Sequence, residues 1–137
     1  MPQLLKEMWD APDFHLDSVA QIHMDSWSRG RVALLGDAGY CASPSSGQGT
    51  TMAMAAAYVL AGELRDAAGD HHAAFAAYER ELRDFVAANQ EIALVARAHI
   101  QQQRAADTDL IEVLSRHEEG DFARVFKKVL AFRLKDY

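Results

Sequence analysis

The sequence of 137 residues contains few residues that cross-link or interrupt a chain: one cysteine, three prolines and eight glycines. The single cysteine, Cys41, cannot form a disulfide within the chain, which agrees with a reducing compartment. No apolar run approaches the roughly 20 residues that a membrane span requires. The first residues lack the basic and apolar regions of a signal peptide. We therefore expect a cytoplasmic protein with no membrane segment.

Basic residues are also scarce, because 14 Lys and Arg stand against 20 Asp and Glu, for a formal net charge of −6. Nucleic-acid binding relies on clustered basic side chains that neutralise phosphates, and no stretch is rich in them. We expect no nucleic-acid partner. The six His residues show no spacing typical of a zinc site. The adjacent His71 and His72 diverge by about 100° on a helix, so we predict no metal site.

The remaining composition is that of one soluble globular domain, with 50% hydrophobic and 25% charged residues. All three prolines and seven of the eight glycines precede residue 70. The second half is rich in Ala, Glu, Arg, Leu and Gln, which favour helices. We predict a mainly α protein with two short strands. The strands lie within 14–35, a loop and a helix occupy 36–69, and helices occupy 70–137.

The two predicted strands show different patterns. Residues 14–24 alternate, with the more apolar side chains at even positions, which is typical of a strand with one buried face. Residues 26–30, Ser-Trp-Ser-Arg-Gly, are typical of a turn. Residues 31–35, Arg-Val-Ala-Leu-Leu, form a short apolar run. Such a run suits a strand covered on both faces in a parallel sheet.

The second half has an apolar stripe with a seven-residue repeat after a predicted N-cap at Asp70. The stripe consists of Phe75, Tyr78, Leu82, Phe85, Asn89, Ile92, Ala96 and His99. It predicts one long helix packed along the rest of the protein, with a coiled-coil dimer as the alternative. Asp107 and Thr108 can cap a helix through residue 114, and residues 118–121 can begin a last helix that carries Phe122 to Leu134. Basic residues suit the negative end of that last helix, namely Lys127, Lys128, Arg133 and Lys135.

The stretch from Gly36 to Thr51 joins the apolar run at 31–35 to an alanine-rich helix over 52–61. Its small residues and glycines let the backbone approach a ligand closely. The amides at a helix start, with the positive end of the helix dipole, favour negatively charged groups. From the residues alone, a ligand-binding loop and a plain strand-to-helix connection remain equally open. The stretch is not a Walker loop, because no Lys follows Gly49.

An ordered series of residues resembles the second flavin-binding motif of the flavoprotein aromatic hydroxylases. The series is Gly30-Arg31-Val32-Ala33-Leu34-Leu35-Gly36-Asp37-Ala38, then Pro44, Gly47-Gln48-Gly49 and Leu60-Ala61-Gly62-Glu63-Leu64. These hydroxylases are FAD-dependent monooxygenases of the para-hydroxybenzoate hydroxylase type. The preceding strand and the segment 77–83 also resemble the C-terminal part of that family. The resemblance implies that residues 1–137 form a single partial domain, a C-terminal segment of an α/β FAD-binding fold.

The resemblance also implies which residues contact FAD. Asp37 matches the acid whose carboxylate bonds a ribityl hydroxyl, and Pro44 matches the proline beside the isoalloxazine edge. The loop and helix start beneath the pyrimidine end of the ring are matched by Gly47, Gln48, Gly49, Thr50 and Thr51. Three positions depart from the family pattern of His, Asn and Asp, and here hold Tyr40, Thr51 and Ala56. No residue is assigned as a catalytic acid or base.

The family begins with a strand and a Gly-x-Gly-x-x-Gly loop that holds the FAD pyrophosphate, and no glycines here have that spacing. We therefore expect this chain alone to bind FAD weakly or not at all, and to be inactive by itself. The expected partners are a separate N-terminal half or further copies in a homo-oligomer. In the completed enzyme, NAD(P)H would reduce the flavin and a small aromatic or polyketide-like substrate would be hydroxylated. The alternative is a non-enzymatic helical module, derived from that family, that acts by association.

Overall fold

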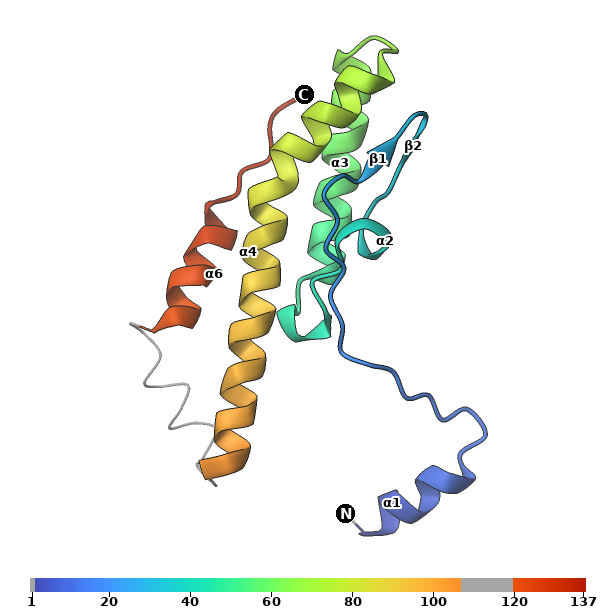
Figure 1. The fold of residues 1–137 in the computed structure, drawn as a ribbon, viewed down its shortest axis with the longest axis vertical. Coiled ribbons are helices and arrows are strands. Elements are labelled where there is room, and N and C mark those ends of the chain that lie inside the picture. Colours follow the sequence, from blue (N-terminus) through green and yellow to red (C-terminus); the bar gives the residue numbers. More distant parts are fainter. Residues whose placement is uncertain (1, 107–119) are drawn as a thin grey trace.

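The computed structural model describes residues 2–106 and 120–137, and helices dominate this part of the chain (Figure 1). The helices are α1 (Pro2–Glu7), α2 (Asp37–Tyr40), α3 (Gly49–Asp66), α4 (His71–Ala106) and α6 (Asp121–Ala131). Two 3₁₀ turns lie at Met8–Asp10 and Pro44–Ser46, and the strands are β1 (Ser28–Arg29) and β2 (Val32–Ala33). The prediction of a mainly α protein is confirmed for these residues. The helix expected through residue 114 lies outside them.

Helix α4 is the scaffold on which α3 and α6 pack (Figure 1). Its start is capped as predicted, because the Asp70 carboxylate accepts hydrogen bonds from the backbone N–H groups of His72 and Ala73 at 3.0 and 3.1 Å. The predicted stripe is buried from Phe75 to Ile92. Helices α3 and α6 and the 44–46 turn of the same chain pack against α4, so the stripe is buried without a coiled-coil partner. The side chain of His99, at the end of the stripe, is outside the described part.

Helix α6 ends earlier than the sequence pattern predicts. It packs on α4 through the buried Val125 and Val129 and stops at Ala131. Phe132 leaves the helix in an extended conformation and stacks its ring on Phe85, with the ring centroids 4.2 Å apart. Arg133 still binds the negative end of the helix, because its Nη1 donates to the Leu130 carbonyl. Lys135 instead belongs to a C-terminal tail that runs back along α4 toward α3 (Figure 1).

The prediction of a strand over residues 14–24 is wrong. The segment is extended, but no strand lies beside it in the described residues. Its backbone is held by the Ile22 N–H, which donates to the Cys41 carbonyl at 3.0 Å, and by side chains of α4 that donate to the carbonyls of Ile22 and Met24. Phe14, Leu16 and Met24 are exposed, so the alternating pattern does not bury one face. A strand forms only where a neighbouring strand satisfies its backbone groups, and alternation alone cannot supply that neighbour.

The apolar run at 31–35 is a strand only at Val32–Ala33, and it is not buried in a parallel sheet. β2 pairs antiparallel with β1 in a two-stranded hairpin, with Ser28 opposite Ala33. β1 occupies part of the predicted turn at 26–30. The actual turn includes Gly30 at a φ of 59°, a conformation that glycine adopts readily. Val32 remains 63% exposed, because the described residues provide no second layer over the hairpin.

A buried pair of tyrosines joins the segment after the hairpin to α4. The hydroxyls of Tyr40 and Tyr78 lie 2.7 Å apart, and the Tyr78 hydroxyl donates to the Leu34 carbonyl at 3.0 Å. Trp27 packs against Tyr40 with ring centroids 4.4 Å apart. Both tyrosines are at most 1% exposed, so their hydroxyls have no access to bulk water as an alternative partner. The pair therefore fixes α2 against α4.

Glu79 holds the segment before the hairpin on α4. Its Oε1 accepts hydrogen bonds from the Ser26 hydroxyl at 2.9 Å, the Ser28 hydroxyl at 2.6 Å and the Trp27 N–H at 2.9 Å. Arg83 pairs with Glu79 Oε2 at 2.7 Å, donates to the carbonyls of the two residues before Ser26, and lies 4.0 Å from the Trp27 ring. Burial acts to raise the pKa of Glu79, but these hydrogen bonds and Arg83 lower it overall.

Removal of the Tyr78 hydroxyl tests the tyrosine pair. Tyr78→Phe leaves the Tyr40 hydroxyl and the Leu34 carbonyl buried without their partner, so we expect the free energy of unfolding to fall by roughly 1–3 kcal/mol. Tyr58→Phe is the matched control: Tyr58 is 43% exposed, and its change should stay within about 0.5 kcal/mol. Urea unfolding followed by circular dichroism gives both values. Equal effects of the two substitutions would contradict this role of the pair.

The same tyrosines predict a loss of stability in alkali. Burial raises the pKa of Tyr40 and of Tyr78 above about 10, the value expected in the unfolded chain. The unfolded chain therefore releases these protons first, so their contribution is fully present below about pH 10 and is lost as the pH rises further. We expect the urea midpoint to fall between pH 9 and pH 11. Tyr78→Phe should show a smaller fall in the same buffers, and an equal fall would contradict the assignment.

Candidate functional site

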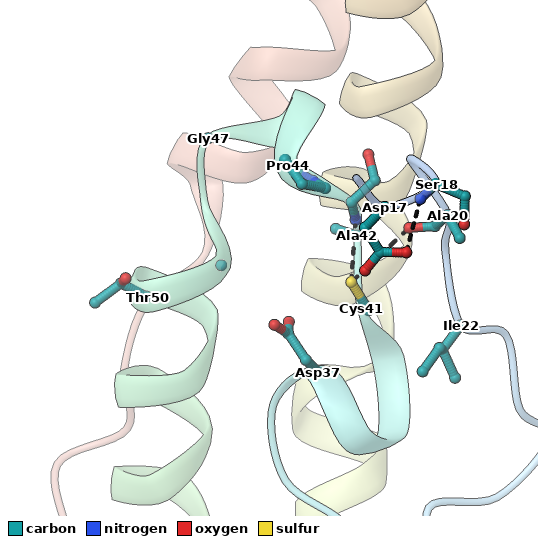
Figure 2. Close-up of a pocket in the computed structure, with 12 residues that line it drawn as sticks. Asp17, Ser18, Ala20, Ile22, Asp37, Cys41, Ala42, Pro44, Gly47 and Thr50 are labelled. Atoms are coloured by element: carbon teal, nitrogen blue, oxygen red, sulfur yellow. Dashed lines mark hydrogen bonds between the residues drawn. The ribbon is translucent and has the colours of Figure 1, made fainter. Parts of the chain in front are cut away.

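A pocket of about 520 Å³ lies beside the start of α3 and brings together most of the predicted site residues (Figure 2). Five of the seven predicted residues line it: Asp37, Pro44, Gly47, Gly49 and Thr50. The other two lie next to it in the chain but do not line it. Gln48 is half-buried immediately before α3, and Thr51 is exposed in the first turn of α3. Five of the seven predicted residues therefore share one pocket.

Asp37 is the first residue of α2, and its side chain enters the pocket from below in Figure 2. Gly36 turns the chain from the hairpin into α2 at a φ of 65°. The Asp37 carboxylate is exposed, and no residue of the described chain donates a hydrogen bond to it. An ionised carboxylate is an acceptor only. Asp37 can therefore accept hydrogen bonds from the hydroxyl groups of a ligand without first breaking a contact within the protein.

The loop between α2 and α3 is held in an unfavourable backbone conformation at Ser43. Its φ is 72°, which costs a residue other than glycine on the order of 1–3 kcal/mol. The Ser43 hydroxyl accepts from the Ser45 N–H at 3.3 Å, and the Ser43 carbonyl accepts from the N–H and the hydroxyl of Ser46 at 3.2 and 3.0 Å. These bonds stabilise the loop from within. Conformations of this kind are concentrated at ligand sites.

The entrance to α3 is open toward the pocket. A Cβ added at Gly47 or at Gly49 would meet no atom within 4 Å, so a flat group can approach the backbone there. The first backbone hydrogen bond of α3 with the i to i−4 spacing of a helix runs from the Met52 N–H to the Gln48 carbonyl, at 2.9 Å. The amides before it have no acceptor within the helix. They can therefore donate, with the positive end of the helix dipole, to acceptor atoms of a ligand.

The opposite wall of the pocket comes from the extended segment that sequence reasoning assigned to a strand. Its lining residues are Asp17, Ser18, Ala20 and Ile22 (Figure 2). Gln21 ties this wall to the loop and to α4, because its Nε2 donates to the Ala42 carbonyl at 3.1 Å and to the Gln90 carbonyl at 2.8 Å. In return, the Gln90 Nε2 donates to the Ile22 carbonyl at 2.7 Å. These amide bonds hold the wall in place of a sheet.

Sequence reasoning missed this wall and gave Cys41 no role. Cys41 lines the pocket, and its Sγ accepts from the Ser43 N–H at 3.4 Å and lies 3.9 Å from the Ala20 carbonyl. The alternation over 14–24 contained a signal for the wall, because the even positions Ser18, Ala20 and Ile22 all line the pocket. The pattern does not separate the wall from the rest of the segment, because the odd position Asp17 also lines the pocket.

The departures from the family pattern at Tyr40 and Ala56 occupy buried positions behind the pocket. The Tyr40 hydroxyl bonds that of Tyr78, and neither tyrosine lines the pocket. Ala56 is fully buried in the core, where an aspartate would bring an ionised group out of water. Thr51, the third departure, is exposed. None of the three lines the pocket.

The described residues show neither a metal site nor a membrane-spanning helix. Within 2–106 and 120–137, no group of three or more His, Cys, Asp or Glu side chains is placed to hold a metal ion. The rings of His71 and His72 lie 4.2 Å apart at the start of α4. Over the same residues, no helix combines the length and the apolar character needed to cross a membrane.

Comparisons of the sequence and of the fold both find proteins similar to this chain. The model of the FAD binding domain family matches residues 11–93. The uncharacterized protein Rv1260 of Mycobacterium tuberculosis is 59% identical over 88 residues, which are 64% of this chain and 24% of that protein. A flavin-dependent monooxygenase of Legionella longbeachae is 51% identical over 88 residues, which are 64% of this chain and 23% of that enzyme.

The crystal structure of the tetracycline destructase Tet(51) matches 99% of this chain and 35% of that chain, with a TM-score of 0.77 and 37% identity. This chain spans about a quarter of the length of the curated relatives that it matches. The family model covers more than half of the chain, and it covers the hairpin, the pocket loop and α3 together. The chain therefore belongs to the FAD-binding domain family, together with flavin-dependent monooxygenases.

Proposed function

We propose that this chain supplies the isoalloxazine and ribityl side of the FAD site of a flavin-dependent monooxygenase. The observation that carries the proposal is the convergence of five motif residues on one pocket of about 520 Å³. These residues differ in chemical type and belong to α2, the loop and the start of α3, yet they line one pocket. A plain strand-to-helix connection would not need an open carboxylate, open glycines and an uncapped helix start at the same place.

The lining residues fit the chemistry of the flavin end of FAD. The unpaired Asp37 carboxylate suits a ribityl hydroxyl, which donates a hydrogen bond. The open positions at Gly47 and Gly49 suit the close approach of a flat ring. The amides at the start of α3 and the helix dipole would stabilise negative charge on the pyrimidine end of the ring. FAD supplies the redox chemistry when bound, and these residues would bind and orient it.

The pyrophosphate end of FAD needs residues that this sequence does not contain. The chain has no Gly-x-Gly-x-x-Gly series for the pyrophosphate. Apolar side chains near the pocket and hairpin are exposed, and they include Leu16, Val19, Val32 and Met54. Surface of this kind is typical of an interface. We propose that a separate N-terminal half of the same family covers it and completes the site, and that further copies of this chain are the alternative partner.

The completed enzyme would use NAD(P)H as reductant and act on a small aromatic or polyketide-like substrate. The neighbour named as a tetracycline destructase supports the polyketide-like choice, because a tetracycline belongs to that class of molecule. A cytoplasmic location agrees with the single cysteine and with NAD(P)H as the reductant. The substrate pocket itself would be built largely by the partner.

Co-expression with the N-terminal half of a flavin-dependent monooxygenase tests the proposal. We expect a soluble yellow complex whose flavin absorbance corresponds to about one FAD per pair of chains. Asp37→Ala removes the acceptor for the ribityl chain, so FAD should bind at least about tenfold more weakly, as expected for loss of a hydrogen bond to a charged group. Asp13→Ala, at an exposed acid outside the pocket, is the matched control and should bind FAD normally.

The same experiment separates the enzyme from the association module. A stable complex that stays colourless with added FAD would contradict the flavin site and favour the non-enzymatic module. An Asp37→Ala complex that retains full FAD affinity would contradict the role of Asp37. If this chain binds stoichiometric FAD by itself, the requirement for a partner is wrong. Light scattering identifies which species carries the colour.

Two neighbouring glycines separate folding from flavin binding. Gly47 has a φ of 63°, so Gly47→Ala should lower the free energy of unfolding by about 1–2 kcal/mol. Gly49 begins α3 in open space, so Gly49→Ala should leave that free energy unchanged or raise it by up to about 1 kcal/mol. Both methyl groups would weaken FAD binding in the complex. Urea unfolding and flavin titration measure the two effects, and normal FAD affinity in Gly49→Ala would contradict close approach of the ring.

A further inference from the structure

The second half of α3 carries a buried carboxylate that the flavin pocket does not use. Glu63 is 6% exposed, and neither Glu63 nor Gly62 lines the pocket. Both belong to the series Leu60–Leu64 that resembles the flavin motif. The Glu63 Oε1 accepts a hydrogen bond from the Tyr137 hydroxyl at 2.8 Å and another from Lys135 Nζ at 3.1 Å. The partners of this carboxylate therefore come from the C-terminal tail.

The ring of Tyr137 lies directly over Gly62. A Cβ built on Gly62 would overlap this ring, so only glycine permits the contact. Tyr58 meets the same ring edge to face, with centroids 5.5 Å apart. Lys135 Nζ and the Arg65 guanidinium lie 4.7 and 6.0 Å from the ring centroid. The ring is held on several sides by α3 and by its own tail.

Charge complements shape in this contact. Asp66 lies one turn after Glu63, and Lys135 Nζ is 3.8 Å from its Oδ2. Lys135 therefore pairs with both acids, and the buried Glu63 has two donors. A buried carboxylate is costly without such partners. A glycine inside a helix is also unfavourable compared with alanine. Gly62 and Glu63 are therefore both unfavourable in α3 by themselves. The tail explains both, because Tyr137 packs on Gly62 and the tail donates hydrogen bonds to Glu63.

We propose that Tyr58, Gly62, Glu63 and Asp66 form a docking site on α3 for the aromatic and basic segment Lys135–Tyr137 of the same chain. The docked segment acts as a strap. Helix α3 is then held at both ends: its start continues from the pocket loop, and its second half is bound to the tail that follows α6. Gly62 and Glu63 serve this contact and not the cofactor, so the inference does not depend on the proposed function.

A double-mutant cycle on the full chain tests the strap through a change of sign. In the Tyr137 chain, Gly62→Ala should lower the melting temperature, because the new methyl group displaces the ring. In the Tyr137→Ala chain, the same substitution should raise it, because alanine favours the helix and the ring no longer opposes the methyl group. Ala61→Gly, at the exposed neighbour, is the matched control and should lower the melting temperature equally in both chains. A rise for Gly62→Ala in both chains would overturn the proposal.

Zero-length cross-linking gives a second measurement that does not depend on cooperative melting. A carbodiimide joins a lysine amine to a carboxylate that it contacts. We expect mass spectrometry to find Lys135 linked to Glu63 or Asp66 within one chain, as shown by mixing isotopically light and heavy protein. Lys127 is exposed on α6 and does not take part in the contact, so it serves as the control. Equal linkage of Lys127 and Lys135 to α3, or linkage only between chains, would overturn the proposal.

Discussion

The hydrogen bonds that join the hydroxyls of Tyr40 and Tyr78 to the Leu34 carbonyl hold the pocket side of the molecule on its helical scaffold. They connect three segments within the core: the chain that leaves the hairpin, the short helix α2 and the long helix α4. Because the groups are buried, each would be costly without the others. Asp37 lies three residues before Tyr40 in α2, so its position depends on this contact.

The same principle recurs along α4. Tyr78, Glu79 with Arg83, and Gln90 lie on successive parts of this helix, and each binds the backbone of an irregular segment. The segment before the hairpin and the wall at 17–22 have almost no strand pairing, so their backbone groups need other partners. Polar side chains of α4 provide these partners. A regular helix thereby positions loops that could not position themselves.

The pocket combines this fixed support with local openness. Ser43 is held at a positive φ by hydrogen bonds within its loop, whereas the Asp37 carboxylate and the entrance to α3 remain without partners of their own in the described structure. This arrangement is typical of a preorganised binding site, in which the backbone is fixed before the ligand binds and the groups that contact the ligand are unpaired. The strap at the far end of α3 extends the same arrangement, because it limits how that helix can shift relative to α4 and α6.

Local signals in the sequence determined the long helix from Asp70, its buried stripe and the spacing of the loop residues that meet in the pocket. These features depend on neighbours within a few turns, which the sequence contains. Tertiary structure alone decided that residues 14–24 become a pocket wall, that 31–35 pairs in a hairpin, and that Tyr137 seats on Gly62. A strand needs a hydrogen-bonding neighbour, and the tail contact joins residues separated by more than 70 positions. A periodic pattern predicts which side chains share one face of a segment. Which other segment packs on that face depends on the tertiary structure.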